Sequence, residues 1–445
     1  MADAVAMGSA ADKEFLGHPR GLTTLFFTEM WERFSYYGMR ALLMLYMVGS
    51  VLQPGLGFGV RRAAWIYSTY TMMVYLMGMP GGFIADRWLG HYRAVLVGGI
   101  IIACGHFSMA VPDIRFFYLG LCLIVIGTGL LKPNVSSLVG ALYSKDDHRR
   151  DSGFSVFYMG INLGAFFSPI VCGWLGQMVN WHFGFAAAGV GMVFGLIQYV
   201  TGRKYLRTVM PQSEPTAGKL VDAVIHTKVA PLSAGDWKRM GALVMLAIFA
   251  LIFWAGFEQA GSSLTLFADR ATRLTIFGFK YPSSLFQSAE PLFVLILSLV
   301  FAWMWLRLGR LEPSSPAKFT LGLVFLSLSF LLIIPAARMF ESTKVPVSPM
   351  WLVGLYFLQA VGELCLSPIG LSLVTKLSPP RLVGLMMGVW FVAMGMGNSV
   401  AGFVAGFLQN RSFTEVFQPV FIAITVAAVI LALMIAPINK LARKD

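Results

Sequence analysis

An apolar stretch near the start of the chain, FFTEMWERFSYYGMRALLMLYM at residues 26 to 47, carries four ionisable side chains. On a helix that advances about 100° per residue, these side chains and two tyrosines share one arc of about 140°. The six residues are Glu29, Glu32, Arg33, Tyr36, Tyr37 and Arg40. A charge at the centre of a bilayer costs at least about 2.5 kcal/mol, so we expect the arc to face a cavity lined by water or protein. A structural ion-pair cluster that only pins helices together is the alternative.

Other apolar stretches contain single ionisable residues that could face the same cavity. They are Lys132 in GLLKPNVSSL, Glu258 in FWAGFEQAGSS, Glu290 in FQSAEPLF and Glu363 in LQAVGELCLSP. Together with the first stretch they make three cations and five acids. Arginine stays protonated under ordinary conditions, whereas a carboxylate removed from water readily takes up a proton. An acid that alternates between an arginine partner and a proton is typical of a proton-driven carrier.

The composition indicates the surroundings in which these residues act. Of 445 residues, 57% are hydrophobic and 12% are charged, and the mean hydropathy is +0.72. Soluble proteins keep roughly a quarter of their residues charged, so an integral membrane protein is predicted. Residues 1–20 lack an apolar core, and no cleavable signal peptide is predicted. The four cysteines lie in apolar runs without CxxC spacing and are predicted to be small buried side chains.

Twelve windows of about 20 apolar residues are long enough to cross a bilayer. They lie at 22–48, 62–85, 93–111, 115–138, 152–177, 181–201, 240–267, 283–306, 317–337, 349–373, 382–407 and 416–436. We therefore predict an all-α integral membrane protein with twelve transmembrane helices in two six-helix bundles. The expected divisions are a tail at 1–21, a bundle at 22–202, a linker at 203–239, a bundle at 240–437 and a tail at 438–445. No extra helix pair is expected in the polar linker.

Lysine and arginine are distributed unevenly between the expected loops. With the N-terminus placed in the cytoplasm, 22 of the 34 Lys and Arg residues fall in cytoplasmic segments and 9 in external loops. The positive-inside rule therefore predicts that both termini are cytoplasmic. The formal charge of +13 is then a signal of topology, so the expected partner is the lipid bilayer and not nucleic acid.

Four stretches of the chain resemble one known family. The first is EMWERFSYYGMR, in which the pattern E-x-x-E-R-F-x-Y-Y is complete from Glu29 to Tyr37. The others are GGFIADRWLG at 81–90, FSVFYMGINLGAFFSP at 154–169 and ELCLSPIGLSLVTKLSP at 363–379. In this order they resemble the proton-dependent oligopeptide transporter family (POT, or PTR2) of the major facilitator superfamily. The resemblance covers nearly the whole chain.

This resemblance implies a peptide site near the midplane between two bundles. Arg33 and Lys132 would bind the peptide carboxylate, because two cations attract an anion and an arginine can grip it with two hydrogen bonds. Asn162, Glu290 and Glu363 would receive the peptide ammonium group. Side-chain pockets would be lined by Tyr36, Tyr37, Tyr75, Trp254, Trp390 and Ser367. For any single aromatic residue, ordinary packing is the common alternative.

The resemblance also implies how protons and conformational change are coupled. The residues expected to take part in proton coupling are Glu29, Glu32, Arg33, Arg40 and Glu258. Two ion pairs would gate the cavity, Arg40 with Glu258 and Lys132 with Glu363. Protonation of Glu258 would break the first pair and favour opening to the outside.

Asp86 and Arg87 belong to the loop motif of the superfamily and are expected to brace the bundle without touching substrate. The implied substrates are di- and tripeptides with protons, moved by a monomer that needs no cofactor other than the proton gradient. The loop RMFESTKVPVS is too short for the external domain of animal members. A bacterial inner membrane is therefore the expected location.

Two positions depart from the family pattern. The family commonly has Asn where this chain has Glu290, so we expect Glu290 to take a second proton or to favour cationic peptides. Neutralisation by a nearby Lys or Arg is the alternative. Animal members use a histidine in the second span, where this chain has Ser68 in WIYSTY. Proton handling is therefore expected to depend on carboxylates.

Other functions remain open at this stage. Nitrate or another anion could occupy the Arg33 and Lys132 subsite, although Asn162 and Glu363 favour a zwitterion. A peptide sensor that binds without transporting is also compatible with the sequence. An intramembrane enzyme is disfavoured, because GxSxG and HExxH motifs are absent and the six histidines lie mostly at loops or span ends. We therefore predict a transporter and not an enzyme.

Overall fold

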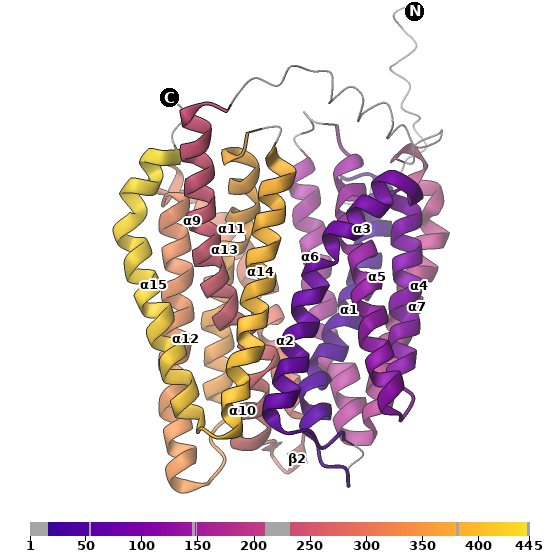
Figure 1. The fold of residues 1–445 in the computed structure, drawn as a ribbon, viewed down its shortest axis with the longest axis vertical. Helices are drawn as coiled ribbons and strands as arrows, with labels where there is room; N and C mark the ends of the chain where they lie inside the picture. The colour runs from indigo at the N-terminus through magenta and orange to yellow at the C-terminus, as the bar shows by residue number, and fades with distance from the viewer. Residues whose placement is uncertain are drawn as a thin grey trace, which may run out of the picture.

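The computed structural model describes residues 17–52, 55–144, 147, 149–209, 232–379 and 382–442. Nearly all of these residues are helical, and the long helices stand side by side in two bundles that follow the two halves of the chain (Figure 1). The predicted all-helical class is confirmed apart from one short hairpin. The first described helix begins, and the last ends, at the same end of the molecule (Figure 1).

The first bundle is formed by seven α-helices and four short π- or 3₁₀-helical segments. They are α1 (Arg20–Val48), α2 (Val60–Leu76), α3 (Gly78–Ile84), η1 (Ala85–Leu89), α4 (His91–Met109), α5 (Ile114–Ala141), α6 (Arg150–Ser168), η2 (Pro169–Gly173), η3 (Leu175–Val179), α7 (Trp181–Thr201) and η4 (Gly202–Val209). The segments η1, η2 and η3 are π-helical, and η4 is 3₁₀-helical.

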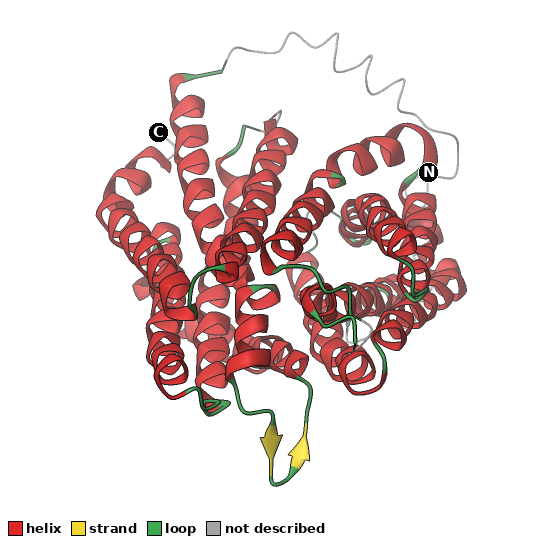
Figure 2. Cartoon of the chain, turned by 60° about the horizontal axis from the view of Figure 1, so that its bottom comes forward, coloured by secondary structure: helices red, strands yellow, loops and turns green. Residues whose placement is uncertain are grey.

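In the described residues, the second bundle contains seven α-helices, four 3₁₀-helical segments and the hairpin. They are α9 (Ala234–Phe257), η5 (Glu258–Gly261), α10 (Ser263–Ala271), β1 (Thr275–Ile276), β2 (Phe279–Lys280), η6 (Ser283–Ser288), α11 (Ala289–Leu308), η7 (Gly309–Leu311), α12 (Ser315–Thr343), α13 (Met350–Leu377), α14 (Val383–Ala405), η9 (Gly406–Gln409) and α15 (Phe413–Ala442). The antiparallel hairpin projects from the end remote from the termini (Figure 2).

Ten helical segments of the described chain are long and apolar enough to cross a membrane. The other two expected spans correspond to α1, whose ionisable residues lower its hydropathy, and to α2, which has only 17 residues before α3 begins. The helix expected from residue 240 begins at Ala234, because Ser233 and Asp236 form a capping box there. The segment expected to lack extra helices falls largely on 210–231, outside the described residues.

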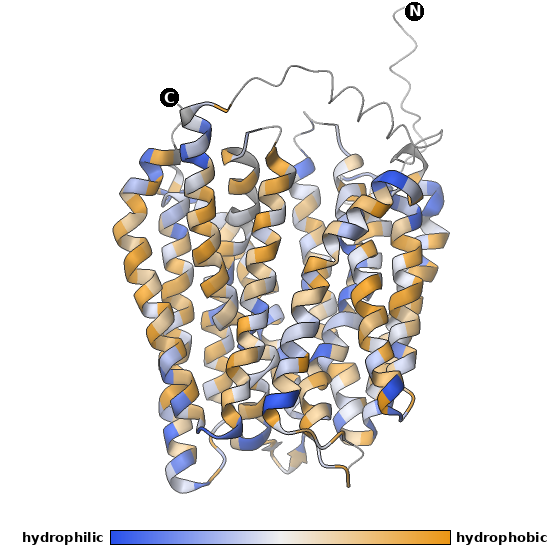
Figure 3. Cartoon of the chain, viewed as in Figure 1, coloured by the Kyte–Doolittle hydropathy of each residue, from blue (hydrophilic) through white to orange (hydrophobic). Residues whose placement is uncertain are grey.

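Apolar residues predominate along the long helices and polar residues are frequent at their ends (Figure 3), and many of the large apolar side chains are exposed. In the most apolar window of Ser283–Leu308, only 11% of the residues are buried, which leaves this helix to contact lipid. The prediction that all four cysteines are buried is wrong for Cys104 and Cys122. Both lie on exposed faces, because an apolar residue in a membrane helix can face lipid as readily as protein.

Glycines form the contact between α2 and α14, the helix pair that joins the two bundles. The glycines recur at seven-residue spacing: Gly388, Gly395 and Gly402. A Cβ atom on Gly402 would lie 2.8 Å from Ser68 Cα, and one on Gly395 would lie 3.0 Å from Tyr75 Cβ. A Cβ atom on Gly388 would lie 3.8 Å from Met79 Sδ. The two helices are therefore in closest contact toward the end remote from the termini.

Polar contacts join the bundles at that same remote end. The Gln177 side chain donates to Ser283 Oγ at 2.8 Å and accepts from the Ser284 backbone N–H at 2.8 Å. The Arg61 backbone N–H donates to Gln409 Oε1 at 3.3 Å. These bonds hold the bundles together on one side of the central charged residues.

Candidate functional site

The charged arc of α1 faces the protein interior, as its spacing predicts. Arg33 Nε lies 3.0 Å from Glu29 Oε1 and 2.5 Å from Glu32 Oε2. The exposed fraction is 4% for Arg33, 3% for Glu29 and 0% for Glu32. Arg33 Nη2 is buried without a hydrogen-bond partner, and the guanidinium carbon lies 5.4 Å from the centroid of the Tyr36 ring. Arg33 therefore retains a donor that an anionic ligand can use.

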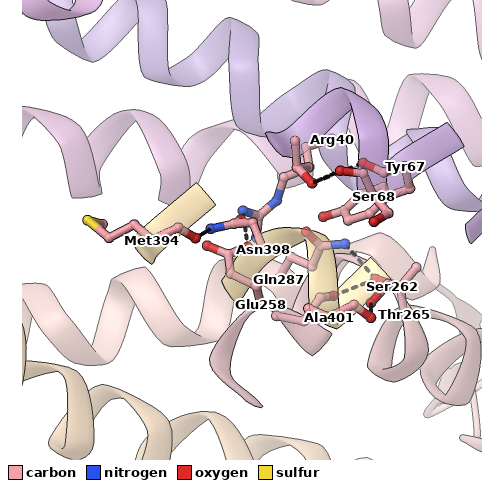
Figure 4. A network of polar contacts seen from close by, with 12 residues as sticks. Arg40, Tyr67, Ser68, Glu258, Ser262, Thr265, Gln287, Met394, Asn398 and Ala401 are labelled. Carbon is pink, nitrogen blue, oxygen red and sulfur yellow. Dashed lines mark hydrogen bonds and ion pairs between the residues drawn. The ribbon is translucent and has the colours of Figure 1, made fainter. Parts of the chain in front are cut away.

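A second buried ion pair connects the two bundles. Arg40 Nη1 donates to Glu258 Oε2 at 2.7 Å, and the two residues are 7% and 4% exposed. Glu258 begins the 3₁₀-helical break η5 between α9 and α10, and the polar contacts around it are drawn in Figure 4. Arg40 also lies 5.0 Å from the centroid of the Tyr37 ring. This arrangement makes the pair sensitive to any relative movement of the bundles.

Lys132 lies on α5 directly before a proline within the helix, Pro133. Its Nζ atom is 4.3 Å from the centroid of the Tyr75 ring, which is a cation–π contact. The expected ion pair between Lys132 and Glu363 is not formed among the described residues of this structure. Glu363 instead accepts from Tyr158 Oη at 3.0 Å.

Two acids from different helices meet in the second bundle. Glu290 lies in the first turn of α11 and Glu363 on α13, and their carboxyl groups lie near each other. Glu290 Oε1 is buried without a hydrogen-bond partner, and Ser367 Oγ donates to Glu363 Oε1 at 3.4 Å. Two neighbouring carboxylates repel each other, so this pair suits binding of a cation or a proton. The alternative in which a Lys or Arg forms an ion pair with Glu290 is not seen among the described residues.

The other residues expected at the site lie on both sides of these charges. Asn162 is buried on α6 and donates from Nδ2 to the carbonyl of Tyr158 at 3.1 Å. Trp254 is buried on α9, and its indole N–H has no partner. Trp390 is buried on α14 against Phe319, with ring centroids 6.0 Å apart. Trp390 is thus held by an aromatic neighbour, whereas Trp254 keeps an unused donor.

The loop motif lies away from the charged centre. Asp86 and Arg87 are both exposed in η1. Asp86 Oδ1 lies 3.8 Å from His91 Nε2, and His91 Nδ1 lies 2.7 Å from Asn134 Oδ1. The motif thus links the start of α4 to α5 within the first bundle.

Residues that the sequence did not assign to the site complete the junction between bundles. Tyr158 on α6 reaches across to Glu363, and Ser68 Oγ donates to the Ser399 carbonyl at 2.6 Å. The Gln177 contacts belong to the same group. For Tyr158 a signal was present, because it lies one helical turn before Asn162 in the motif FSVFYMGINLG.

A membrane protein with two helical bundles and buried charges at their junction has the architecture of a solute transporter. Comparison with known proteins identifies the family. The model of the POT family, PTR2, matches residues 92–230 and 223–421. The chain belongs to the POT family.

Individual relatives are similar in sequence to this chain along nearly its full length. The chain is 42% identical to the protein named uncharacterized transporter YclF of Bacillus subtilis, over 88% of each chain. It is 36% identical to the di-/tripeptide transporter of Lactococcus lactis, over 87% of this chain and 89% of the other. A crystal structure of the peptide transporter POT in complex with sulfate has a TM-score of 0.88 and 38% identity, covering 97% of this chain and 98% of the other.

Proposed function

We propose that this protein is a proton-coupled symporter that imports di- and tripeptides by alternating access. The observation that carries the proposal is the division of buried charge between the bundles. Arg33 keeps a free donor in the first bundle, and the pair Glu290 and Glu363 lies in the second. A small zwitterion has the complementary charges at its two ends. The relative of Lactococcus lactis named for di- and tripeptides supports this choice of substrate.

Arg33 and Lys132 bind the peptide carboxylate in this proposal. The guanidinium Nη2 of Arg33 is unpartnered, and Lys132 contacts an aromatic face instead of an acid. The peptide ammonium group then binds Glu363 with Glu290, next to Asn162. Pockets lined by Tyr36, Tyr37, Tyr75, Trp254, Trp390 and Ser367 accept varied side chains, because aromatic faces discriminate weakly.

The ion pair of Arg40 and Glu258 couples proton entry to opening. Protonation of Glu258 removes the charge that holds Arg40, which weakens the junction at the remote end. Glu29 and Glu32 neutralise Arg33 while the site is empty, so that no bare cation is left in a buried cavity.

The closed remote end supports an assignment of conformational state. Under the predicted topology that end faces outward, so this structure corresponds to an inward-facing state. The ion pair of Lys132 and Glu363 would then form in the opposite state, when the termini side closes. The ion pair is absent here because Glu363 instead accepts hydrogen bonds from Tyr158 and Ser367.

We further propose twelve spans, counting α1 and the pair α2 and α3 with the ten apolar helices. Both termini are then cytoplasmic, in a bacterial inner membrane, with Asp86 and Arg87 in the first cytoplasmic loop. The proposed divisions are 1–21, 22–202, 203–239, 240–437 and 438–445, although α9 begins at Ala234 within the linker and α15 continues to Ala442 within the final tail. The transporter acts as a monomer and is driven by the proton gradient without a cofactor.

Uptake into proteoliposomes tests this function. Labelled di-alanine should accumulate under an inward proton gradient, and excess unlabelled di- and tripeptides should compete. Competition by nitrate but not by peptides would support the anion transporter instead. Binding without counterflow would support the sensor.

A further inference from the structure

Two cavities lie along the back of α1, on the side away from the charged arc. Both are formed where α1 packs against α7, and we refer to this junction as the α1–α7 groove. One cavity is polar and lies where α1 begins and α7 ends. The other is apolar and lies further along the same two helices, where α6 also contributes.

The polar cavity has a volume of about 380 Å³ and is lined by two cations, Arg20 and Lys204. Both flank one ring: the Arg20 guanidinium carbon lies 5.3 Å and Lys204 Nζ 5.0 Å from the centroid of Tyr205. Neither cation forms an ion pair within the described ranges, and the described lining contains no acid. Two cations without an anion therefore share one small cavity.

Uncharged donors also line this cavity. Thr23 Oγ1 is buried without a hydrogen-bond partner, and Gln198 of α7 also lines the cavity. The first turn of α1 has no side-chain cap and no acidic residue. The two cations, the unpartnered hydroxyl group of Thr23 and the uncapped helix N-terminus are together complementary to the oxygens of a phosphate group.

The apolar cavity has a volume of about 680 Å³ and is lined almost entirely by hydrocarbon. Trp31 of α1 and Phe194 of α7 form its wall, with ring centroids 5.2 Å apart. Phe183, Val190 and Phe194 are 57%, 44% and 49% exposed, so the cavity opens toward the membrane and not toward the peptide site. An alkyl chain fits such a groove.

Helical periodicity aligns the two cavities. Arg20 and Trp31 are eleven residues apart, which is three turns and about 16 Å along α1. On α7, Val190, Phe194 and Gln198 follow at four-residue steps on one face. About 16 Å is close to half the thickness of the hydrocarbon core, so one cavity lies at headgroup depth and the other at acyl-chain depth.

We propose that the α1–α7 groove binds one anionic glycerophospholipid, with its phosphate in the polar cavity and an acyl chain in the apolar one. Charge complementarity selects an anionic headgroup, because a zwitterionic headgroup brings its own ammonium group toward Arg20 and Lys204. The apolar cavity selects a lipid over free phosphate. The bound lipid contacts the face of α1 opposite Glu29 and Arg33, outside the peptide site.

Native mass spectrometry of the purified transporter tests this proposal, using dioleoyl phosphatidylglycerol, dioleoyl phosphatidylethanolamine and inorganic phosphate as probes. The wild type should retain phosphatidylglycerol about tenfold more tightly than phosphatidylethanolamine. The double variant Arg20→Gln/Lys204→Gln should lose about 10- to 30-fold of that affinity, since each basic residue near a membrane surface contributes about 1 kcal/mol. Unchanged binding would overturn the proposal.

A matched control and a second variant separate lipid binding from charge and folding effects. Arg93→Gln/Arg203→Gln removes the same charge from the same end outside the cavity, and it should retain phosphatidylglycerol within about twofold. Ala187→Phe fills the apolar cavity and should weaken the binding of dioleoyl lipids. Ala187→Phe and the double variant Arg20→Gln/Lys204→Gln should both keep the wild-type melting temperature in detergent. Displacement of the lipid by millimolar inorganic phosphate, or equal loss in the control, would overturn the lipid assignment.

Discussion

The charges of the first bundle and those of the second are built in different ways. Arg33 forms ion pairs with Glu29 and Glu32 of the same helix, so its positive charge is compensated within α1 without help from other elements. Glu290 and Glu363 come from separate helices and meet only when the second bundle is packed. The first set contains a cation that stays charged, whereas the second contains acids, which lose their charge when they take up a proton.

This difference indicates a division of labour. A permanent positive charge that is preorganised on one helix suits recognition of an anionic group. Acids held by tertiary packing suit a change of protonation, because any movement of the bundles alters their surroundings. Arg40 and Glu258 join the two types, since they pair a fixed cation with an acid across the junction.

Removing Arg33 should have the largest effect. Arg33→Ala leaves two buried acids without their partner, which costs about 3–5 kcal/mol. We expect proton-driven uptake of di-alanine into proteoliposomes to fall by at least about 100-fold. Adding Glu29→Gln and Glu32→Gln should restore the melting temperature in detergent but not uptake. If that triple variant takes up di-alanine as well as the wild type does, the ion pairs of α1 have only a structural role.

Glu258→Gln should uncouple transport without abolishing exchange. At one proton per peptide, a gradient of about 1.5 pH units supports about 30-fold accumulation, and the variant is expected to lose all of it. Counterflow of labelled di-alanine should survive. Glu312→Gln, which removes the partner of Lys318 at the periphery, is the control and should accumulate normally. Full accumulation by Glu258→Gln would remove this ion pair from the coupling mechanism.

Glu290→Gln should change selectivity more than rate. The pair of Glu290 and Glu363 then keeps one acid, so we expect the preference for lysine-containing over neutral dipeptides to fall by about tenfold. Competition assays at several pH values, with the proton-to-peptide ratio, provide the measurement. If neither the preference nor the ratio changes, Glu290 has no part in substrate or proton binding.

Weakening the remote end should have the smallest effect. Gln177→Ala removes contacts to Ser283 and Ser284, and hydrogen bonds of this kind contribute about 0.5–1.5 kcal/mol each. At the lower end of that range the two bonds together correspond to an increase of about fivefold in the outward-open population, measured between spin labels on the remote ends of α7 and η6. Gln287→Ala, whose bond to Thr265 stays within one bundle, should leave the distances unchanged. An equal shift in both variants would show that the Gln177 contacts do not govern opening.

Local features of the site were predictable from the sequence, and contacts between helices were not. The one-turn spacing of Glu29 and Arg33 fixed their encounter, and the pair of Arg40 and Glu258 followed from the family resemblance. The contact of Glu290 with Glu363 depends on how α11 packs against α13, which no spacing within one helix reveals.

The conformational state was equally hidden from the sequence. The pair of Lys132 and Glu363 was expected without knowledge of which side of the molecule is closed. Conversely, hydropathy alone does not detect α1 as a membrane span, because α1 carries the charged residues of the candidate site. The fold was therefore easier to predict than the state in which it is found.

The glycines of α14 have a consequence for how the equilibrium can be tuned. A methyl group at Gly402 would strike the backbone of α2, whereas one at Gly388 finds ordinary van der Waals room against Met79. Gly388→Ala therefore adds a methyl group that this state accommodates, whereas Gly402→Ala would push α2 and α14 apart where they are closest. The two variants would shift the relative position of the bundles without altering a single charge.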